Sequence, residues 1–90
     1  MADMMIIYRV MPEDGDIEYS ELEIVTKRTV EQYHKSVKVK EVEPVSVGFG
    51  LKAVKIKFTI DENCGSEDLE ETLKKLEEVG DVTVELMDRM

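Results

Sequence analysis

The chain opens with an apolar run that is followed by an amphipathic segment. From Met4 to Met11 nearly every residue is apolar, with Arg9 as the one break, and Pro12 ends the run. Apolar side chains on both parities are typical of a central strand, because both faces of such a strand are at least partly covered. The pattern therefore predicts a β-strand over residues 4–11.

Beyond the Asp14–Asp16 turn, apolar residues recur at helical spacing, which predicts a helix from about Ile17 to His34. Glutamates lie near its start and basic residues toward its end, as the helix dipole favours. His34 is expected to cap its C-terminal end. The predicted buried stripe comprises Leu22, Val25, Thr29 and Tyr33.

A second helix is predicted after residues 61–65, which have the composition of a loop. Ser66 is a favourable N-cap, with acidic residues in the turn that follows. Gly80 is interpreted as the terminator of this helix, because glycine is common just past a helix end. The predicted buried face comprises Leu69, Leu73, Leu76 and Gly80.

Two adjacent strands are predicted in the middle of the chain. Residues 37–47 alternate between apolar and polar, but the period slips at residues 41–43, before Pro44. That slip predicts a bulge or an edge strand. Residues 51–60 form the clearest strand, with one apolar face made of Val54, Ile56, Phe58 and Ile60.

A last strand is predicted near the C-terminus, where Val82, Val84 and Leu86 share one face. It is expected to end near Met87 and to leave residues 88–90 as a tip, with the permanent cation of Arg89 at its end. A frayed terminus is the simpler interpretation of the same three residues. A tip of three residues would extend the strand by about 10 Å.

The predicted order is β-α-β-β-α-β, which is typical of a ferredoxin-like α+β sandwich with both helices on one face of an antiparallel sheet. The length of 90 residues corresponds to one domain, residues 1–90. The opposite face of the sheet is expected to stay open. By strand parity we expect four lysines to point away from the helices on that side: Lys38, Lys40, Lys55 and Lys57.

Composition narrows the classes of function. The formal net charge of -9 opposes general binding to nucleic acid or to an anionic membrane. The single cysteine, Cys64, permits no intrachain disulfide and suits a reducing compartment, so we expect a cytoplasmic protein. We also expect it to be a monomer. Only Gln32 and Asn63 carry side-chain amides, which favours a heat-adapted source with a melting midpoint above the mesophile range.

The charge is unevenly distributed, because residues 35–57 carry six lysines against two glutamates, a local balance of +4. These lysines are consistent with a soluble face that discourages edge pairing. They are equally consistent with a docking surface for an acidic or phosphate-bearing partner. An RNA-binding sheet would also need aromatic rings for stacking, and only Tyr8 is available for that role on the predicted open face.

Catalytic chemistry is scarce in the sequence. One histidine and one cysteine, far apart along the chain, give no nucleophile–base pair, and no Cys/His cluster is present for a transition metal. A calcium loop starting at Asp61 would need glycine and glutamate where Ser66 and Thr72 stand. We therefore expect no metal, no cofactor and no covalent catalysis.

The turn Gly48-Phe49-Gly50 is the most informative local feature. Glycine on each side of an apolar ring permits positive φ and removes side-chain bulk around the ring. The turn either presents Phe49 to a partner or folds the ring back over its own sheet edge.

These residues carry a resemblance to a known family. The segment EPVSVGFGLKAV, residues 43–54, resembles the P-V-x-x-G-x-G-[IL]-K-x-[LV] signature of the beta exchange subunit of translation elongation factor 1. The run GSEDLEE at residues 65–71 and the run VGDVTV at residues 79–84 resemble two further segments of that family. A short chain that ends soon afterwards is similar to the archaeal form, which consists of the exchange domain alone.

The resemblance implies a guanine-nucleotide exchange factor that promotes GDP release and GTP reloading on the GTP-binding elongation factor 1-alpha. It implies that Phe49, between Gly48 and Gly50, inserts into a pocket of the G domain, and that Lys52 is the signature lysine after the turn. In eukaryotic members a lysine before the final residue reaches the magnesium–phosphate region. Arg89 occupies that place here, with the charge but not the compact ammonium. The alternative is a small RNA-binding module that uses the lysine-lined face.

Overall fold

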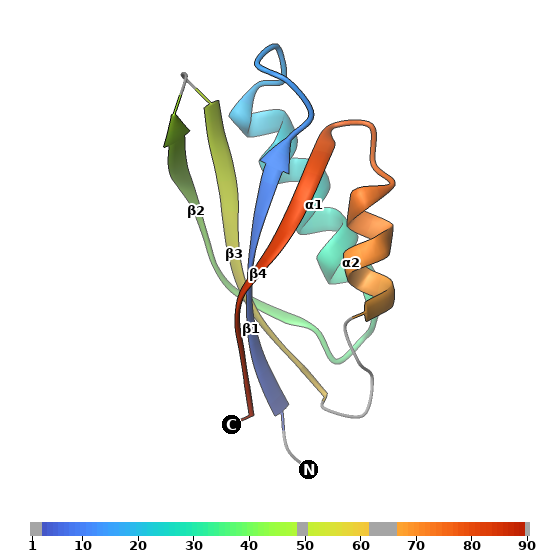
Figure 1. Ribbon diagram of the computed structural model, residues 1–90. Coiled ribbons are helices and arrows are strands. Elements are labelled where there is room, and N and C mark those ends of the chain that lie inside the picture. The colour runs from blue at the N-terminus through green and yellow to red at the C-terminus, as the bar shows by residue number, and fades with distance from the viewer. Residues whose placement is uncertain (1–2, 49–50, 62–66, 90) are drawn as a thin grey trace.

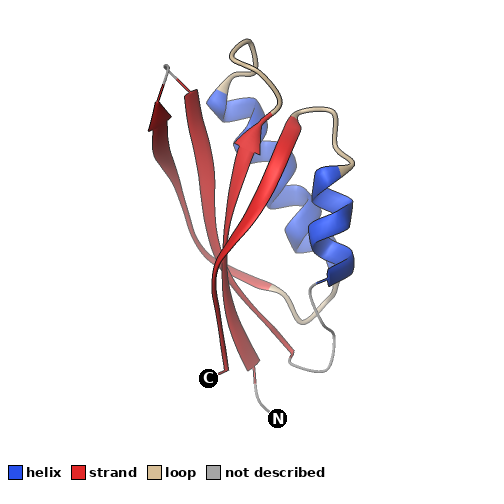
Figure 2. Ribbon diagram, in the orientation of Figure 1, coloured by secondary structure: helices blue, strands red, loops and turns tan. Residues whose placement is uncertain are grey.

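The strand predicted to be central lies inside the sheet. The computed structural model describes residues 3–48, 51–61 and 67–89. The strands pair antiparallel in the order β2-β3-β1-β4. Both helices lie on one face of this sheet (Figures 1 and 2), which confirms the ferredoxin-like α+β fold. The elements are β1 (Asp3–Pro12), α1 (Tyr19–Tyr33), β2 (Lys38–Gly48), β3 (Leu51–Asp61), α2 (Glu67–Lys74) and β4 (Val79–Arg89).

The core lies between the helices and the two inner strands. Tyr8 of β1 and Phe58 of β3 are fully buried, and their rings meet edge to face with centroids 5.3 Å apart. Such aromatic pairs add about 0.5–1.5 kcal/mol beyond their burial. The burial of Tyr8 corrects the expectation that its ring is available for stacking on the open face. The other fully buried core residues include Ile6, Val10, Leu22, Val30, Val54, Ile56, Leu69 and Leu73.

Helix α1 buries a stripe that differs from the predicted one. Leu22, Thr26 and Val30 are its buried residues, at a spacing of four, whereas Val25 and Thr29 lie half-buried at the margin. Residues four apart lie on one face of a helix, and α1 packs against both the sheet and α2, so the buried face is centred one position away from the predicted stripe. The Oγ1 hydroxyl of Thr26 is buried without a hydrogen-bond partner among the described residues.

Helix α2 ends at Lys74, and Gly80 is not its terminator. Backbone hydrogen bonds from Leu76 to Leu73 and from Val79 to Leu76 turn the chain directly into β4. Gly80 lies within that strand, where a Cβ would stand 2.8 Å from the carbonyl oxygen of Pro12. The glycine is therefore required by the close approach of two backbones, and not by the end of a helix.

Two bulges change which side chains face the open side of the sheet. In β2 the register shifts between Val39 and Glu41, and β2 is an edge strand, so both parts of the prediction for this segment are confirmed. In the β1–β4 ladder, Ile7 pairs with Leu86 and Tyr8 with Val84, so Glu85 is an extra residue. An extra residue moves the following side chains to the opposite face. Leu86 accordingly faces the open side, and not the side of Val84 as predicted.

None of the helices in the described ranges is both long and apolar enough to cross a membrane.

Candidate partner-binding surfaces

The β2–β3 hairpin positions the glycine-flanked turn at one end of the sheet. Gly48 has a φ of 96°, in the region that favours glycine, and nothing stands within 4 Å of the position that a Cβ would take. Backbone conformation, and not lack of space, therefore selects glycine here. Phe49 and Gly50 lie outside the described residues. Lys52 follows as an exposed residue of β3, paired with Ser46.

The C-terminal segment is part of the sheet. Strand β4 continues to Arg89, whose backbone pairs with Met4 of β1, and Asp88 pairs with Met5. The expectation that residues 88–90 leave the sheet as a tip is thus wrong for Asp88 and Arg89, because the bulge at Glu85 keeps the ladder in register beyond Leu86. The backbone of Arg89 is held by strand pairing instead of fraying, and Met90 lies outside the described residues.

The structure does not bring the hairpin and Arg89 together. Arg89 pairs with Met4, Met4 pairs with Ile60, and Ile60 lies nine residues beyond Leu51 along β3. At about 3.3 Å per residue, the two ends are separated by about 30 Å. Figure 1 shows them at opposite ends of the sheet, and the molecule measures 42 × 20 × 17 Å. One pocket of a partner cannot receive both ends.

The open face of the sheet is not a purely basic surface. Lys55 and Lys57 lie on it as predicted, but Glu43 and Glu41 stand directly opposite them on β2. Lys55 Nζ lies 3.7 Å from Glu43 Oε1. Parity alone placed only the lysines on this face, and the bulge after Val39 places the glutamates beside them. The lysine-lined interface of the RNA-binding alternative is therefore charge-compensated, and that alternative also loses its stacking ring.

His34 ends α1, as predicted, at the C-cap position. Its Nδ1 lies 2.8 Å from Ser36 Oγ and accepts a hydrogen bond from the Ser36 amide at 3.1 Å. Ser36 Oγ in turn accepts a hydrogen bond from the Asp61 amide at 3.2 Å. The imidazole thus fixes the connection between α1 and β2 against the end of β3, which is a structural role.

Other candidate chemistry is limited. Among the residues with described structure, no group of three or more His, Cys, Asp or Glu side chains is placed to hold a metal ion. Cys64 and most of the loop considered for calcium lie outside the described residues. Tyr19 is half-buried at the start of α1, and its burial, followed by the nearby carboxylates of Glu23 and Glu43, raises its pKa to about 12.

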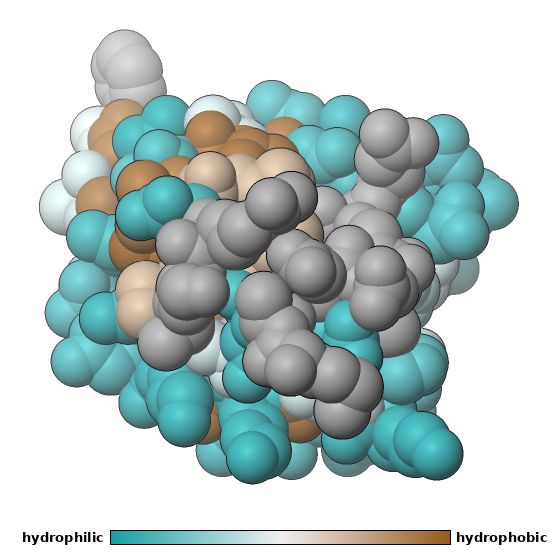
Figure 3. Space-filling model, turned by 90° about the horizontal axis from the view of Figure 1, so that it is seen from below, coloured by the Kyte–Doolittle hydropathy of each residue, from teal (hydrophilic) through white to brown (hydrophobic). Residues whose placement is uncertain are grey.

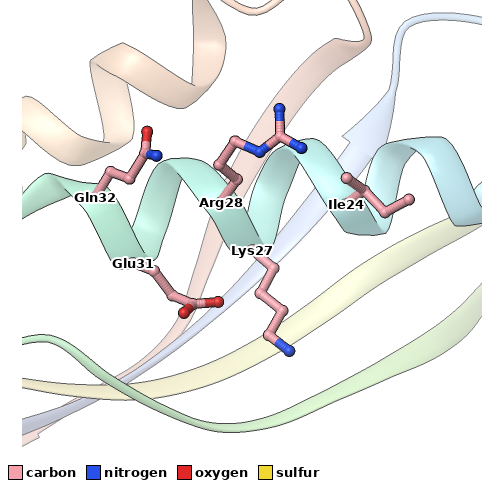
Figure 4. A pocket seen from close by; sticks show the side chains of 5 residues that line it. All are labelled: Ile24, Lys27, Arg28, Glu31 and Gln32. Atoms are coloured by element: carbon pink, nitrogen blue, oxygen red, sulfur yellow. The ribbon is translucent and has the colours of Figure 1, made fainter.

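A shallow depression runs along the outer side of α1, and all of its lining side chains come from that one helix (Figure 4). Ile24 is 55% exposed there, and Lys27 and Glu31 point away from Arg28. A depression whose walls, within the described ranges, come from one helix offers little enclosure to a small ligand. The lining residues are Ile24, Lys27, Arg28, Glu31 and Gln32.

Arg9 is a further candidate that the sequence-based interpretation left unassigned. It lies half-buried on the open face, opposite Lys55 on β3 and Thr83 on β4. The sequence did contain a sign of this position. Arg9 is the one charged residue in the apolar run of residues 4–11, and in a strand its side chain points to the face opposite that of Tyr8.

Comparison with known proteins gives consistent results over almost the whole chain. A family model described as the EF-1 guanine nucleotide exchange domain matches residues 5–90. Elongation factor 1-beta of Caldivirga maquilingensis is 33% identical, with 100% of this chain and 98% of that protein aligned. Elongation factor 1-beta of Staphylothermus marinus is 36% identical, over 100% and 99% of the two chains. The protein of the same name from Thermoplasma acidophilum is 27% identical over 94% of each.

Proposed function

Since the chain belongs to the EF-1 guanine nucleotide exchange family, we propose that it promotes GDP release and GTP reloading on an archaeal elongation factor 1-alpha. The observation that carries this proposal is the family match over residues 5–90. We further propose that residues 1–90 act as a single exchange domain, as a monomer in the cytoplasm. The reaction needs no covalent step by this protein, no metal of its own and no cofactor.

The physical requirement for exchange is differential binding. A factor accelerates GDP release when it binds the nucleotide-free partner more tightly than the GDP-bound partner. Each tenfold preference corresponds to about 1.4 kcal/mol, so a few new contacts made only with the nucleotide-free form have a large effect. Such contacts would come from groups that compete with the nucleotide or its magnesium ion for the elements that hold them.

Two groups of this chain are proposed to make those contacts. The ring of Phe49, in the turn between Gly48 and Gly50, enters a pocket of the G domain, with Lys52 beside it. Arg89 acts at the magnesium–phosphate region, where its permanent cation competes with Mg²⁺. Because the hairpin end and the Arg89 end lie about 30 Å apart along the sheet, the partner must offer two separate receptor sites at that spacing.

Two variants test these assignments separately. We expect Phe49→Ala to slow exchange at subsaturating protein, because docking is lost while the fold is retained. Removal of Arg89 and Met90 should leave the Kd for the GDP-bound partner nearly unchanged, weaken binding to the nucleotide-free partner and lower the maximal rate of GDP release.

Isothermal titration against nucleotide-free and GDP-bound partner, together with release rates, checks both expectations. Lys27→Ala, on the exposed side of α1, serves as the control. Equal affinity of the wild-type protein for the two partner states would contradict the proposed function. Normal maximal release by the truncated protein would remove Arg89 from the mechanism.

A further inference from the structure

The open face of the sheet carries an apolar column that no helix covers. Both helices lie on the opposite face (Figure 2), and Met5, Ile7 and Met11 of β1 alternate with the buried core residues of the same strand. Leu86 joins this column opposite Ile7, because the bulge at Glu85 turns it outward, and it is 39% exposed. Seen from the end that carries the termini, apolar surface gathers on one side of the molecule (Figure 3).

Arg9 interrupts this column with a cation that has no counter-ion among the described residues. Its Nε atom is buried and has no hydrogen-bond partner, and no ion pair reaches Arg9 from the part of the chain that is described. Its neighbour across the ladder, Lys55, is also a cation and lies 3.7 Å from Glu43 on the far side. On its other side Arg9 faces Thr83, which is uncharged. A buried donor without an acceptor is unfavourable until a binding partner supplies one.

The surroundings of Arg9 favour a protein carboxylate as that acceptor. The planar guanidinium fork binds carboxylate or phosphate in bidentate fashion. Glu41 and Glu43 on the same face, together with the net charge of -9, repel a polyanion such as RNA. Ile7 and Met11 flank Arg9 on the same face of β1, and apolar residues of this kind commonly contact the side chains of another folded protein.

A second copy of this chain is a poor occupant of the same face. A twofold interface centred on Arg9 would bring this uncompensated cation of each copy toward its own symmetry mate. Like charges in that arrangement disfavour association. The partner is therefore a different protein.

The face also lies between the two ends that the proposed function uses. A partner that contacts both the β2–β3 hairpin and the end of β4 has to span the length between them. Four strands about 4.8 Å apart and about 30 Å of strand give a face of roughly 500–600 Å². An area of that order is a large part of the roughly 800 Å² that each partner contributes to a standard interface.

We propose that this open face is the docking surface for the GTP-binding partner, and that the partner places a carboxylate against Arg9. The inference rests on the proposed function and extends it to a surface outside the hairpin and the C-terminus. Binding at Arg9 would orient the sheet so that both of its ends reach their separate receptor sites.

Substitution of Arg9 tests the inference against a matched arginine. We expect Arg9→Gln to weaken binding to nucleotide-free partner by about 30-fold or more, and Arg9→Glu by still more, because truncating one member of a buried charge pair has a cost of that size. Arg28→Gln, on the helix layer, should stay within about twofold of wild type, since exposed charges contribute little. Thermal unfolding of each variant establishes that it is folded. Arg9 variants that bind as tightly as wild type would overturn the inference.

A second measurement uses the wild-type protein and so does not depend on the variants folding. With ¹³C-labelled methionine methyl groups, addition of partner should shift or broaden the signals of Met5 and Met11. The signal of Met4, which packs against the core on the other face and pairs with Arg89, reports separately on the proposed contact of the C-terminal end. Unchanged Met5 and Met11 signals would overturn the inference.

The Met5 and Met11 signals also test whether a second copy of the chain or a nucleic acid binds the open face instead. Changes at Met5 and Met11 on concentration of the protein alone, or on addition of an RNA oligonucleotide in place of partner, would also overturn the inference in favour of a second copy or a nucleic acid. Failure of the wild-type protein to bind the partner at all would remove the proposed function and this inference together. Normal exchange with insensitive Arg9 variants would remove the inference only.

Discussion

The two faces of the sheet differ in how their side chains are packed and in which groups they offer to a partner. The face that the helices cover is mostly apolar, and its central side chains pack against α1 and α2 with almost no exposed area. The open face mixes methionines, lysines, glutamates and one arginine, and among the described residues it carries one ion pair, between Lys55 and Glu43. Packing on the covered face therefore contributes most of the folding stability, and the groups available to a partner lie on the open face. The predictions below run from the largest expected effect to the smallest.

Neighbouring residues of β3 give the sharpest contrast between the faces. We expect Phe58→Ala to lower the free energy of unfolding by about 3–5 kcal/mol, because it removes a fully buried ring and its contact with Tyr8. Lys57→Ala, one residue away and facing the open side, should change it by about 1 kcal/mol or less. Chemical denaturation measures both. Similar losses for the two variants would contradict the division between the faces.

Gly80 tests the close approach of β4 to the end of β1. We expect Gly80→Ala to destabilise the fold by about 1–3 kcal/mol, because its Cβ would meet the backbone of Pro12 and Glu13 at 2.8 to 3.0 Å. Gly15→Ala is the control, since the nearest atom to its Cβ would be a side-chain carbon of Leu51 at 3.5 Å, an ordinary contact. Thermal unfolding should separate the two variants. Equal midpoints would mean that the strands can move apart without cost.

Thr26 marks a defect in the covered face. Its hydroxyl is buried without a hydrogen-bond partner among the described residues. Thr26→Val keeps the shape of the side chain and removes the unsatisfied group, so we expect a gain of about 1 kcal/mol in the free energy of unfolding. Thr29→Val, half-buried one residue beyond the stripe, should have a smaller effect. A loss of stability in Thr26→Val would indicate that the hydroxyl has a partner after all.

Ionisation of Tyr19, at the edge of the covered face, is expected to lower the free energy of unfolding at alkaline pH. Its pKa is about 12 in the folded protein and about 10 in an unfolded chain, so between these values the unfolded state releases the proton first. The contribution of Tyr19 is complete below pH 10 and is lost as the pH rises toward 12. We expect Tyr19→Phe to lose less stability than wild type over that window in denaturant titrations. Parallel curves would contradict the raised pKa.

The covered face could be predicted from the sequence because it depends on periodicity. The alternation of residues 51–60 and the apolar run of residues 4–11 identified most of the core, and the order of elements identified the fold. The slip before Pro44 correctly indicated a bulge and an edge strand. His34 was correctly placed at the end of α1.

The open face could not be predicted in the same way, because bulges depend on pairing with a neighbouring strand. The extra residue at Glu85 turned Leu86 outward and drew Arg89 into the sheet, and neither change has a local sequence signal. Similarly, Glu41 and Glu43 moved beside the lysines only through the shift after Val39. Gly80 was misassigned because a glycine after a helical pattern looks the same whether it ends the helix or admits another backbone.

The most direct test of the exchange function is stopped-flow release of fluorescent GDP from elongation factor 1-alpha, with excess unlabelled GDP and increasing concentrations of this protein. We expect the release rate to rise with protein concentration and then to saturate, because nucleotide dissociates from a complex of the two proteins. A release rate that stays at its intrinsic value at every concentration would contradict the proposed function.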